Sequence, residues 1–388
     1  MMESLHAIHK NDRLHSLDIL RGLSLLGILL VNMKSFHEPA LYKSSFVSST
    51  AAPDRLIEQF INLFAQASFY PLFSFLFGAG SVIFYERAKK KGHSFARYYS
   101  KRLLGLFIIG MLHAALIWHG DILTNYAIIG FIFMIFLTWS AGRLMKGALW
   151  ILILPNLLIT LALMAAYLGE PLSLDPEKNG SKEAIQQSLD VYSTGSFMEI
   201  TQQRLTDWAY VNNAENAIFL ILSILPLFML GAAAYKRGWF HQPMTKEWKR
   251  TAIITGTAAA VFKGMPYYWH ESILTQHLQL SLGGPALTLC YVSLALMFLN
   301  KFKFRLEPIR AVGRGSLSNY LLQSIVCTFI FYSYGLGFYG EISVWTGFML
   351  VFIIYGMQVF LSHLWFKRYG FGPAEWLLRK WIYFSPRP

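Results

Sequence analysis

The chain has 388 residues, of which 55% are hydrophobic and only 14% are charged, and its formal net charge is +13. A soluble globular protein carries about 25% charged residues, so this composition indicates a polytopic membrane protein rather than a soluble enzyme. A strongly positive charge can indicate nucleic-acid binding in a soluble chain, but the distribution of the basic residues gives a different explanation here.

Apolar segments long enough to cross a bilayer recur along the whole chain. They predict an all-α fold with about ten transmembrane helices. We expect a cytoplasmic tail (1–16), a first bundle of five helices (17–168), an extracytoplasmic insertion (169–215), a second bundle of five helices (216–366) and a cytoplasmic amphipathic segment (367–388). The ten segments are 17–37, 62–86, 102–118, 122–140, 146–168, 216–236, 250–268, 280–300, 311–333 and 342–366.

The basic residues predict the orientation of these helices. If the N-terminus is cytoplasmic, 25 of the 34 Lys and Arg residues fall in cytoplasmic segments. Cytoplasmic loops of membrane proteins carry such an excess of Lys and Arg. We therefore expect both termini to be cytoplasmic, the lipid bilayer to be the main partner, and the protein to be a multi-pass protein of a bacterial cytoplasmic membrane. Nucleic-acid binding is not expected.

The first apolar segment carries polar residues, namely Asp18, Arg21 and Asn32. At roughly 100° per residue, Asp18 and Asn32 lie about 40° apart around the helix, and Arg21 lies within about 60° of Asp18. Charges inside a membrane span are costly and therefore indicate function. The structural alternative is an ion pair and an amide that stabilise helix contacts.

A short outer turn joins the third and fourth segments, with His119 and Asp121 at the membrane boundary and His113 inside the end of the third segment. An imidazole beside a carboxylate can act as a general base, although the same cluster is equally typical of a structural interface. His37 lies in the loop after the first segment. Two histidines and one aspartate lack a further ligand at a defined spacing, so we expect no metal.

Two other regions contain polar residues of interest. Insertion 169–215 holds eight acidic and three basic residues, and its Ser196 and Glu199 form a predicted capping box at the start of a helix that could cover an outer site. The ninth apolar segment places Arg314 near the inner surface, with Asn319 and Gln323 on one helix face.

Several motifs together resemble one family. They are SLDILRGLSLLGILLVN (16–32), FSFLFGAG (73–80), HGDILTNYAIIG (119–130), VGRGSLSNYLLQSI (312–325) and FGPAEWLLR (371–379). Nearly end to end, the chain is similar to the bacterial YeiB-like membrane proteins, the domain of unknown function numbered 418. That family in turn resembles the transmembrane acyltransferases, which include heparan-α-glucosaminide N-acetyltransferase.

The resemblance implies transfer of an acyl group from cytoplasmic acyl-CoA to an acceptor on the far side of the membrane. Asp18, Arg21 and Asn32 match the superfamily pattern in the first helix. Glycan O-acyltransferases have His where this chain has Asn32, whereas glucosaminide enzymes have Asn and a catalytic His further on in the next loop. His37 comes sooner than that residue, so His37, His113 and His119 remain alternatives.

The resulting hypothesis is a membrane-embedded acyltransferase with acyl-CoA as donor. Arg21, Arg102 and Arg314 would bind the phosphates, with Asp18, Asn319 and Gln323 as further cofactor-binding candidates. His113 or His37 would take the acceptor's proton or the acyl group, with Asp121 orienting an imidazole, Asn32 stabilising the oxyanion and His119 as a further catalytic candidate. The acceptor is a glycan, lipid or small molecule, and a homodimer is possible. The alternatives are a transporter or exporter and a non-catalytic scaffold.

Overall fold

A computed structural model describes residues 14–43, 49, 51–169, 182–240, 245–302 and 306–383, so most of the expected tail (1–16) lies outside the described residues. Across these ranges the chain is helical, without a strand. The membrane-length helices that the composition predicts are present. Seven described helices are long and apolar enough to cross a membrane, and two shorter apolar helices cover Leu123–Phe136 and Ser316–Phe331. Each of the ten expected segments overlaps a helix.

The helices follow one another along the chain with short connections. They are α1 (His15–His37), η2 (Ala40–Tyr42), α2 (Ala52–Phe64), α3 (Phe69–Lys90), α4 (Phe95–Leu116), α5 (Leu123–Phe133), η3 (Met134–Phe136), α6 (Ala141–Gly169), α8 (Lys182–Thr194), α9 (Phe197–Val211), α10 (Ala214–Lys236), α11 (Thr245–Tyr268), α12 (Ile273–Leu278), the π-helix η4 (Gln279–Gly283), α13 (Gly284–Phe302), α14 (Glu307–Arg314), α15 (Ser316–Phe331), α16 (Val344–Arg368) and α17 (Pro373–Tyr383).

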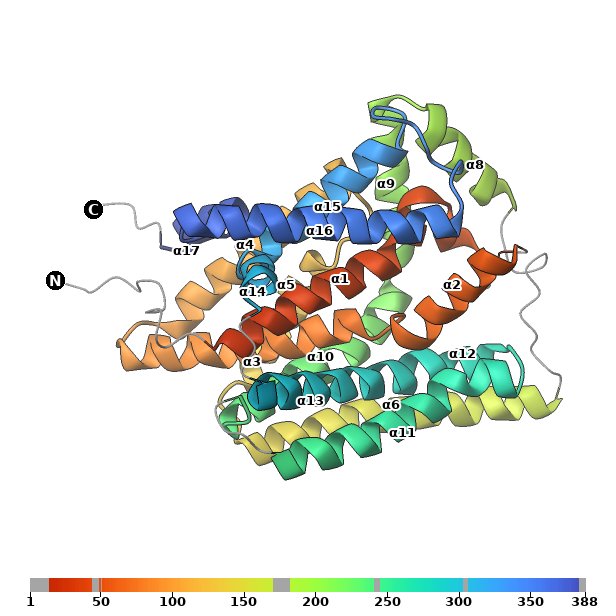
Figure 1. Cartoon of the computed structure of the whole chain (residues 1–388). Helices are drawn as coiled ribbons and strands as arrows, with labels where there is room; N and C mark the ends of the chain where they lie inside the picture. The colour runs from red at the N-terminus through yellow and green to blue at the C-terminus, as the bar shows by residue number, and fades with distance from the viewer. Residues whose placement is uncertain are drawn as a thin grey trace.

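Helix α1 lies near the middle of the molecule and packs against α3, α14, α15 and α16. Most long helices run side by side along one direction, with α17 and the start of α1 at the left end of Figure 1 and α8 and α9 at the opposite end. The two halves of the sequence are interleaved, because α3 packs against α10 and α1 against α14. Both ends of α1 are therefore surrounded by helices from distant parts of the chain.

Glycines allow the central helices to approach closely. A Cβ added at Gly78 of α3 would lie 2.0 Å from the carbonyl oxygen of Phe228, and one at Gly231 of α10 would lie 1.8 Å from that of Phe75. A Cβ at Gly313 of α14 would lie 1.7 Å from the carbonyl oxygen of Asp18. Small residues at helix contacts are the usual means of close packing in a bilayer. This packing explains the glycines of the 73–80 and 312–325 motifs.

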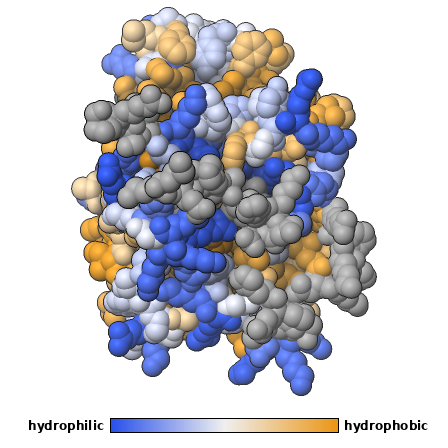
Figure 2. Space-filling model, turned by 90° about the vertical axis from the view of Figure 1, so that its left-hand side faces the viewer, coloured by the Kyte–Doolittle hydropathy of each residue, from blue (hydrophilic) through white to orange (hydrophobic). Residues whose placement is uncertain are grey.

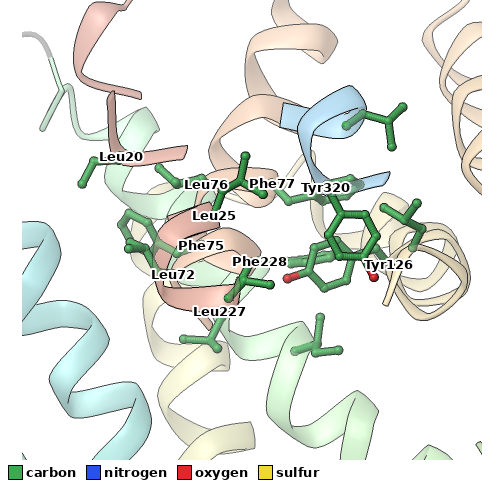
Figure 3. Close-up of a cluster of buried hydrophobic side chains, with 14 of the residues drawn as sticks. Leu20, Leu25, Leu72, Phe75, Leu76, Phe77, Tyr126, Leu227, Phe228 and Tyr320 are labelled. Carbon is green, nitrogen blue, oxygen red and sulfur yellow. The ribbon is translucent and has the colours of Figure 1, made fainter. Parts of the chain in front are cut away.

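The apolar core lies where α1, α3, α5, α10 and α15 meet, and Figure 3 shows part of it. Leu25 of α1 and Leu76 of α3 are fully buried there, beside Phe228 of α10. The end of the molecule at the left of Figure 1 is different. Figure 2 shows hydrophilic residues gathered across the middle and the lower edge of that face, with hydrophobic residues mainly at the top and parts of the sides, as expected for an end that meets water at a membrane surface.

Two buried cations stabilise helix ends. Lys263 of α11 is buried and donates to the backbone carbonyls of Asn62, at 3.1 Å, and Gln66, near the C-terminus of α2. Arg204 of α9 is fully buried and donates to the carbonyls of Leu116 and Ile117 at the end of α4, at 2.7 and 3.0 Å. The predicted capping box is present at Ser196 and fixes the start of α9.

Candidate functional site

A cavity of about 260 Å³ lies beside the first half of α1. Arg21 of α1, Arg102 of α4 and Arg314 of α14 all line it. These three arginines, the expected phosphate ligands, come from separate parts of the sequence, and the fold brings them to one place. We call this space the inner cavity.

Each of these guanidinium groups is held by local contacts. Arg21 donates to the buried carboxylate of Asp18 at 3.1 Å, and Gly80 leaves it room, since a Cβ there would lie 3.3 Å from Arg21 Nη2. Arg102 lies over the ring of Phe77 at 5.2 Å. Arg314 lies over a ring of α16, that of Phe366, at 4.4 Å. A ring contact orients a guanidinium, which keeps its positive charge.

Helix α17 lines one side of the inner cavity with Glu375 and Leu378. Its Glu375 accepts hydrogen bonds from the backbone N–H groups of Leu317, at 2.7 Å, and Ser318, at 3.2 Å. Glu375 therefore caps the N-terminus of α15, where a negative charge is favourable. Trp381 donates through Nε1 to the carbonyl of Lys101 at 2.9 Å and ties α17 to α4. The predicted amphipathic C-terminal segment thus packs into the bundle as well.

His113 and Asp121 form a fully buried pair between the ends of α4 and α5. His113 Nδ1 lies 3.0 Å from Asp121 Oδ2, while Asp121 Oδ1 accepts from the backbone N–H and hydroxyl of Thr124, both at 2.8 Å. Gly110 makes room for this carboxylate, because a Cβ there would lie 2.7 Å from Asp121 Oδ1. Nε2 of His113 is buried and has no hydrogen-bond partner among the described residues. A carboxylate on one nitrogen fixes the tautomer and leaves the other nitrogen free for chemistry.

Tyr320 of α15 connects this pair with the inner cavity. Its ring lines the cavity and lies 5.1 Å from the ring of His113, centroid to centroid. Its hydroxyl donates to the carbonyl of Gly120 at 3.2 Å. Figure 3 shows Tyr320 next to Tyr126, with Leu25 and Phe77 also lining this space. The inner cavity therefore ends against the residues that surround His113.

A second cavity, of about 450 Å³, lies beside the last turns of α1. Asn32, His37 and His119 line it. We call it the outer cavity. Gly120 also lines it, whereas Ile122 lines the inner cavity, so the short segment 118–123 separates the two spaces. The polar residues predicted to share one face of α1 therefore line two different cavities. Arg21 lines the inner cavity and Asn32 lines the outer cavity, and the apolar residues Leu25 and Ile28 lie between them.

Ion pairs surround the outer cavity. Lys34 lies 2.6 Å from the carboxylate of Glu58 of α2 and 3.5 Å from that of Glu38, and Lys43 also contacts Glu38. Burial raises the pKa of Glu38, but Lys34 and Lys43 outweigh this effect, so the pKa lies below its usual value. The Glu38 carboxylate is therefore ionised beside the two lysines, and the outer cavity is polar.

Asn319 and Gln323 have a different environment. Asn319 donates to the carbonyls of Val312 and Gly315, both at 3.1 Å, and to a hydroxyl of α16. Gln323 donates to the side chain of Gln358 at 2.9 Å and to the carbonyl of Leu25 at 3.3 Å. Neither residue lines the inner cavity. These contacts give both amides a role in joining α15 to α1 and α16.

Comparison with known proteins identifies the family. A family described as "Protein of unknown function (DUF418)" matches residues 234–385. The chain is also 34% identical to the uncharacterized protein YxaH of Bacillus subtilis, over 100% of this chain and 98% of that protein. It belongs to the DUF418 family. A further family relative is the uncharacterized protein YeiB of Escherichia coli, which is 27% identical over 95% of this chain and 96% of its own length.

Another relative is an uncharacterized 39.9 kDa protein of Bacillus acidopullulyticus, 27% identical over 96% of this chain and 94% of that protein. The predicted resemblance to the YeiB-like DUF418 proteins is thus confirmed.

Proposed function

We propose that this chain is a membrane acyltransferase that takes an acyl group from cytoplasmic acyl-CoA and passes it to an acceptor bound in the outer cavity. The observation that carries this proposal is the convergence of Arg21, Arg102 and Arg314 on one cavity that Tyr320 also lines, with the ring of Tyr320 5.1 Å from that of His113, centroid to centroid. Arginine clusters are typical of phosphate binding, and a buried imidazole with one free nitrogen is typical of acyl-transfer catalysis.

The donor binds with its phosphates on the three arginines and its thioester arm along α1. Asp18 and Asn32 are separated by fourteen residues, or about 21 Å of helix, which is comparable with an extended pantetheine arm. The inner cavity, at about 260 Å³, is slightly smaller than a typical small-ligand site of about 300–1,000 Å³. Donor entry therefore requires side-chain movement, and Tyr320 at the cavity end is the residue that must move.

The chemistry takes place at segment 118–123. His113 Nε2 accepts either the acyl group or the acceptor's proton, and Asp121 stabilises the imidazolium that forms. Asn32 and His37 lie on the acceptor side, where the amide of Asn32 donates to the developing oxyanion. The acceptor is a glycan, lipid or small molecule with a hydroxyl or amine.

This function requires a defined orientation in the cytoplasmic membrane. We propose that ten helices cross the bilayer with both termini in the cytoplasm, so that the inner cavity faces the acyl-CoA pool. The excess of basic residues in the segments assigned to the inside supports this orientation. The hydrophilic end in Figure 2 is then the cytoplasmic face.

The test is acyl-CoA turnover by the purified protein. His113→Gln should retain acetyl-CoA binding and lose thioester cleavage by about 100-fold, the typical contribution of a positioned general base. His363→Gln, on α16 and outside both cavities, is the matched control and should keep full turnover. Turnover that is the same in His113→Gln and wild type would remove the proposed chemistry.

A transporter is the second candidate, because two cavities at opposite ends of α1, separated by a short segment, also suit alternating access. A transporter would show substrate flux in proteoliposomes without acyl-CoA. The acyltransferase would show acyl-CoA-dependent product and no such flux.

A further inference from the structure

A second histidine–carboxylate pair lies at the outer cavity. His119 lines that cavity, and its Nδ1 lies 3.6 Å from Oδ2 of Asp207 in α9. His119 is 8% exposed and Asp207 is 1% exposed. The Nδ1 atom is buried and has no hydrogen-bond partner among the described residues. Catalytic hydrogen bonds are often long before substrate binds, so a separation of 3.6 Å suits a pair that tightens on binding.

The carboxylate of Asp207 is held from three elements. Tyr42 of η2 donates its hydroxyl to Oδ1, Tyr192 of α8 donates its hydroxyl to Oδ2 at 2.7 Å, and Gln203 of α9 donates its amide to Oδ1 at 2.7 Å. A buried carboxylate that accepts three hydrogen bonds is fixed in position. This rigidity is what a group that orients an imidazole needs.

Arg204 fixes His119 relative to this carboxylate. It comes from the same helix as Asp207 and donates to the carbonyls of Leu116 and Ile117, three and two residues before His119. The extracytoplasmic helix α9 is thus bonded directly to the segment between α4 and α5 that carries His119. A helix that only covered the outer mouth would not need such a buried contact.

We propose that His119 is the proton acceptor for the substrate in the outer cavity and that Asp207 is its positioning residue. This inference rests on the proposed function, which places the acceptor in that cavity. The acceptor's O–H or N–H proton moves to His119 Nε2 as the acyl–acceptor bond forms. The acyl group arrives on His113 Nε2, which has displaced the CoA thiolate from the thioester, and its bond to His113 breaks in the same step. The CoA thiolate takes a proton from the cytoplasmic side, and His119 releases its proton to the outer solution.

Four groups face the His119 imidazole from the helices packed around it. Burial lowers the pKa of His119, the carboxylate of Asp207 raises it, and the charges of Arg204 and His113 lower it further. The ring of Tyr192 lies 6.4 Å away, centroid to centroid, and is neutral because burial raises its pKa well above the usual value. Asp207 is therefore the one group among these that favours the protonated imidazole.

The test measures the reactivity of His119 with diethyl pyrocarbonate as a function of pH, with the modified residue mapped by mass spectrometry in the full chain. This reagent attacks neutral imidazole, so the profile reports the protonation of His119. In Asp207→Asn the midpoint should move to lower pH. The matched control is Asp190→Asn, on the exposed face of α8, and should leave the midpoint unchanged. An unchanged midpoint in Asp207→Asn would overturn the proposal.

A second readout uses acetyl-CoA hydrolysis, with water as the acceptor. Asp207→Asn should lower kcat without changing acetyl-CoA affinity, and His119→Asn should lower kcat by about 100-fold. If the Asp207→Asn protein does not fold, the His119→Asn protein provides the test. Acetyl-CoA hydrolysis at the wild-type rate in His119→Asn would refute the inference. Loss of turnover in His113→Gln with full turnover in His119→Asn would leave the proposed function standing and remove this inference alone.

Discussion

At the scale of single residues, the sequence indicated the three arginines because charges near membrane spans are costly and need partners. The sequence could not show that the three arginines line one cavity. That arrangement depends on the contact of α1 with α14 and on the contact of α4 with α17. Asp207 was missed for a similar reason. It lies 88 residues after His119, and only the docking of α9 through Arg204 brings the two together.

Arg102 provides the clearest prediction at this scale. It has ring contacts and no ion pair in the described part of the chain, so its charge is available to a donor phosphate. Arg102→Ala should weaken acetyl-CoA binding about 10-fold, as expected for the loss of one charge-assisted hydrogen bond worth about 1.4 kcal/mol. Calorimetry measures this change. Arg143→Ala, on the exposed start of α6, is the control, and equal weakening by both variants would contradict a specific phosphate site.

At the scale of helices, periodicity and length predicted every long apolar element, because these features depend on local sequence. The contacts between helices were not predicted, since they depend on which glycine meets which backbone. Asn319 and Gln323 show the difference. Their helix was expected and is present, but their amides join α15 to α16 and α1 instead of lining the inner cavity.

The glycine contact of α3 with α10 leads to a stability prediction. Gly78→Ala would place a Cβ 2.0 Å from the carbonyl oxygen of Phe228, so the two helices must separate. We expect destabilisation of about 1–3 kcal/mol, measured by thermal unfolding in detergent. Gly356→Ala on α16 is the control, since a Cβ there meets nothing within 4 Å. Equal stability of the two variants would show that the close contact is not needed.

The cap that α17 provides for α15 leads to another prediction. Glu375→Gln removes the negative charge of the side chain that accepts hydrogen bonds from the backbone N–H groups of Leu317 and Ser318. Hydrogen exchange in the first turn of α15 should become faster, because a charge-assisted cap of about 1 kcal/mol is weakened. Glu341→Gln, at the other end of the molecule, should leave that exchange unchanged. Protection that stays the same in Glu375→Gln would rule out this role.

At the scale of the whole molecule, composition predicted a membrane protein with several helices, and the described structure has seven helices of spanning length. The orientation is a separate prediction, based on the basic residues. Met198 of α9, 74% exposed, should be extracytoplasmic, and Lys90 at the end of α3 should be cytoplasmic.

Labelling of intact cells tests this orientation. In a background with Cys290 and Cys327 replaced by Ser, a membrane-impermeant maleimide should modify the Met198→Cys variant directly. It should modify the Lys90→Cys variant only after the membrane is permeabilised. The reverse pattern would place the arginine cavity on the wrong side for cytoplasmic acyl-CoA.

Binding of acyl-CoA in the inner cavity can be measured by a thermal-shift titration with acetyl-CoA and longer acyl-CoAs. A ligand that binds only the folded state adds about 2.7 kcal/mol of stability at 100 times its Kd. We expect a concentration-dependent rise in Tm for the wild-type protein and a much smaller rise for the Arg21→Ala/Arg102→Ala double variant. No rise with any acyl-CoA, or an equal rise in both proteins, would contradict binding in this cavity.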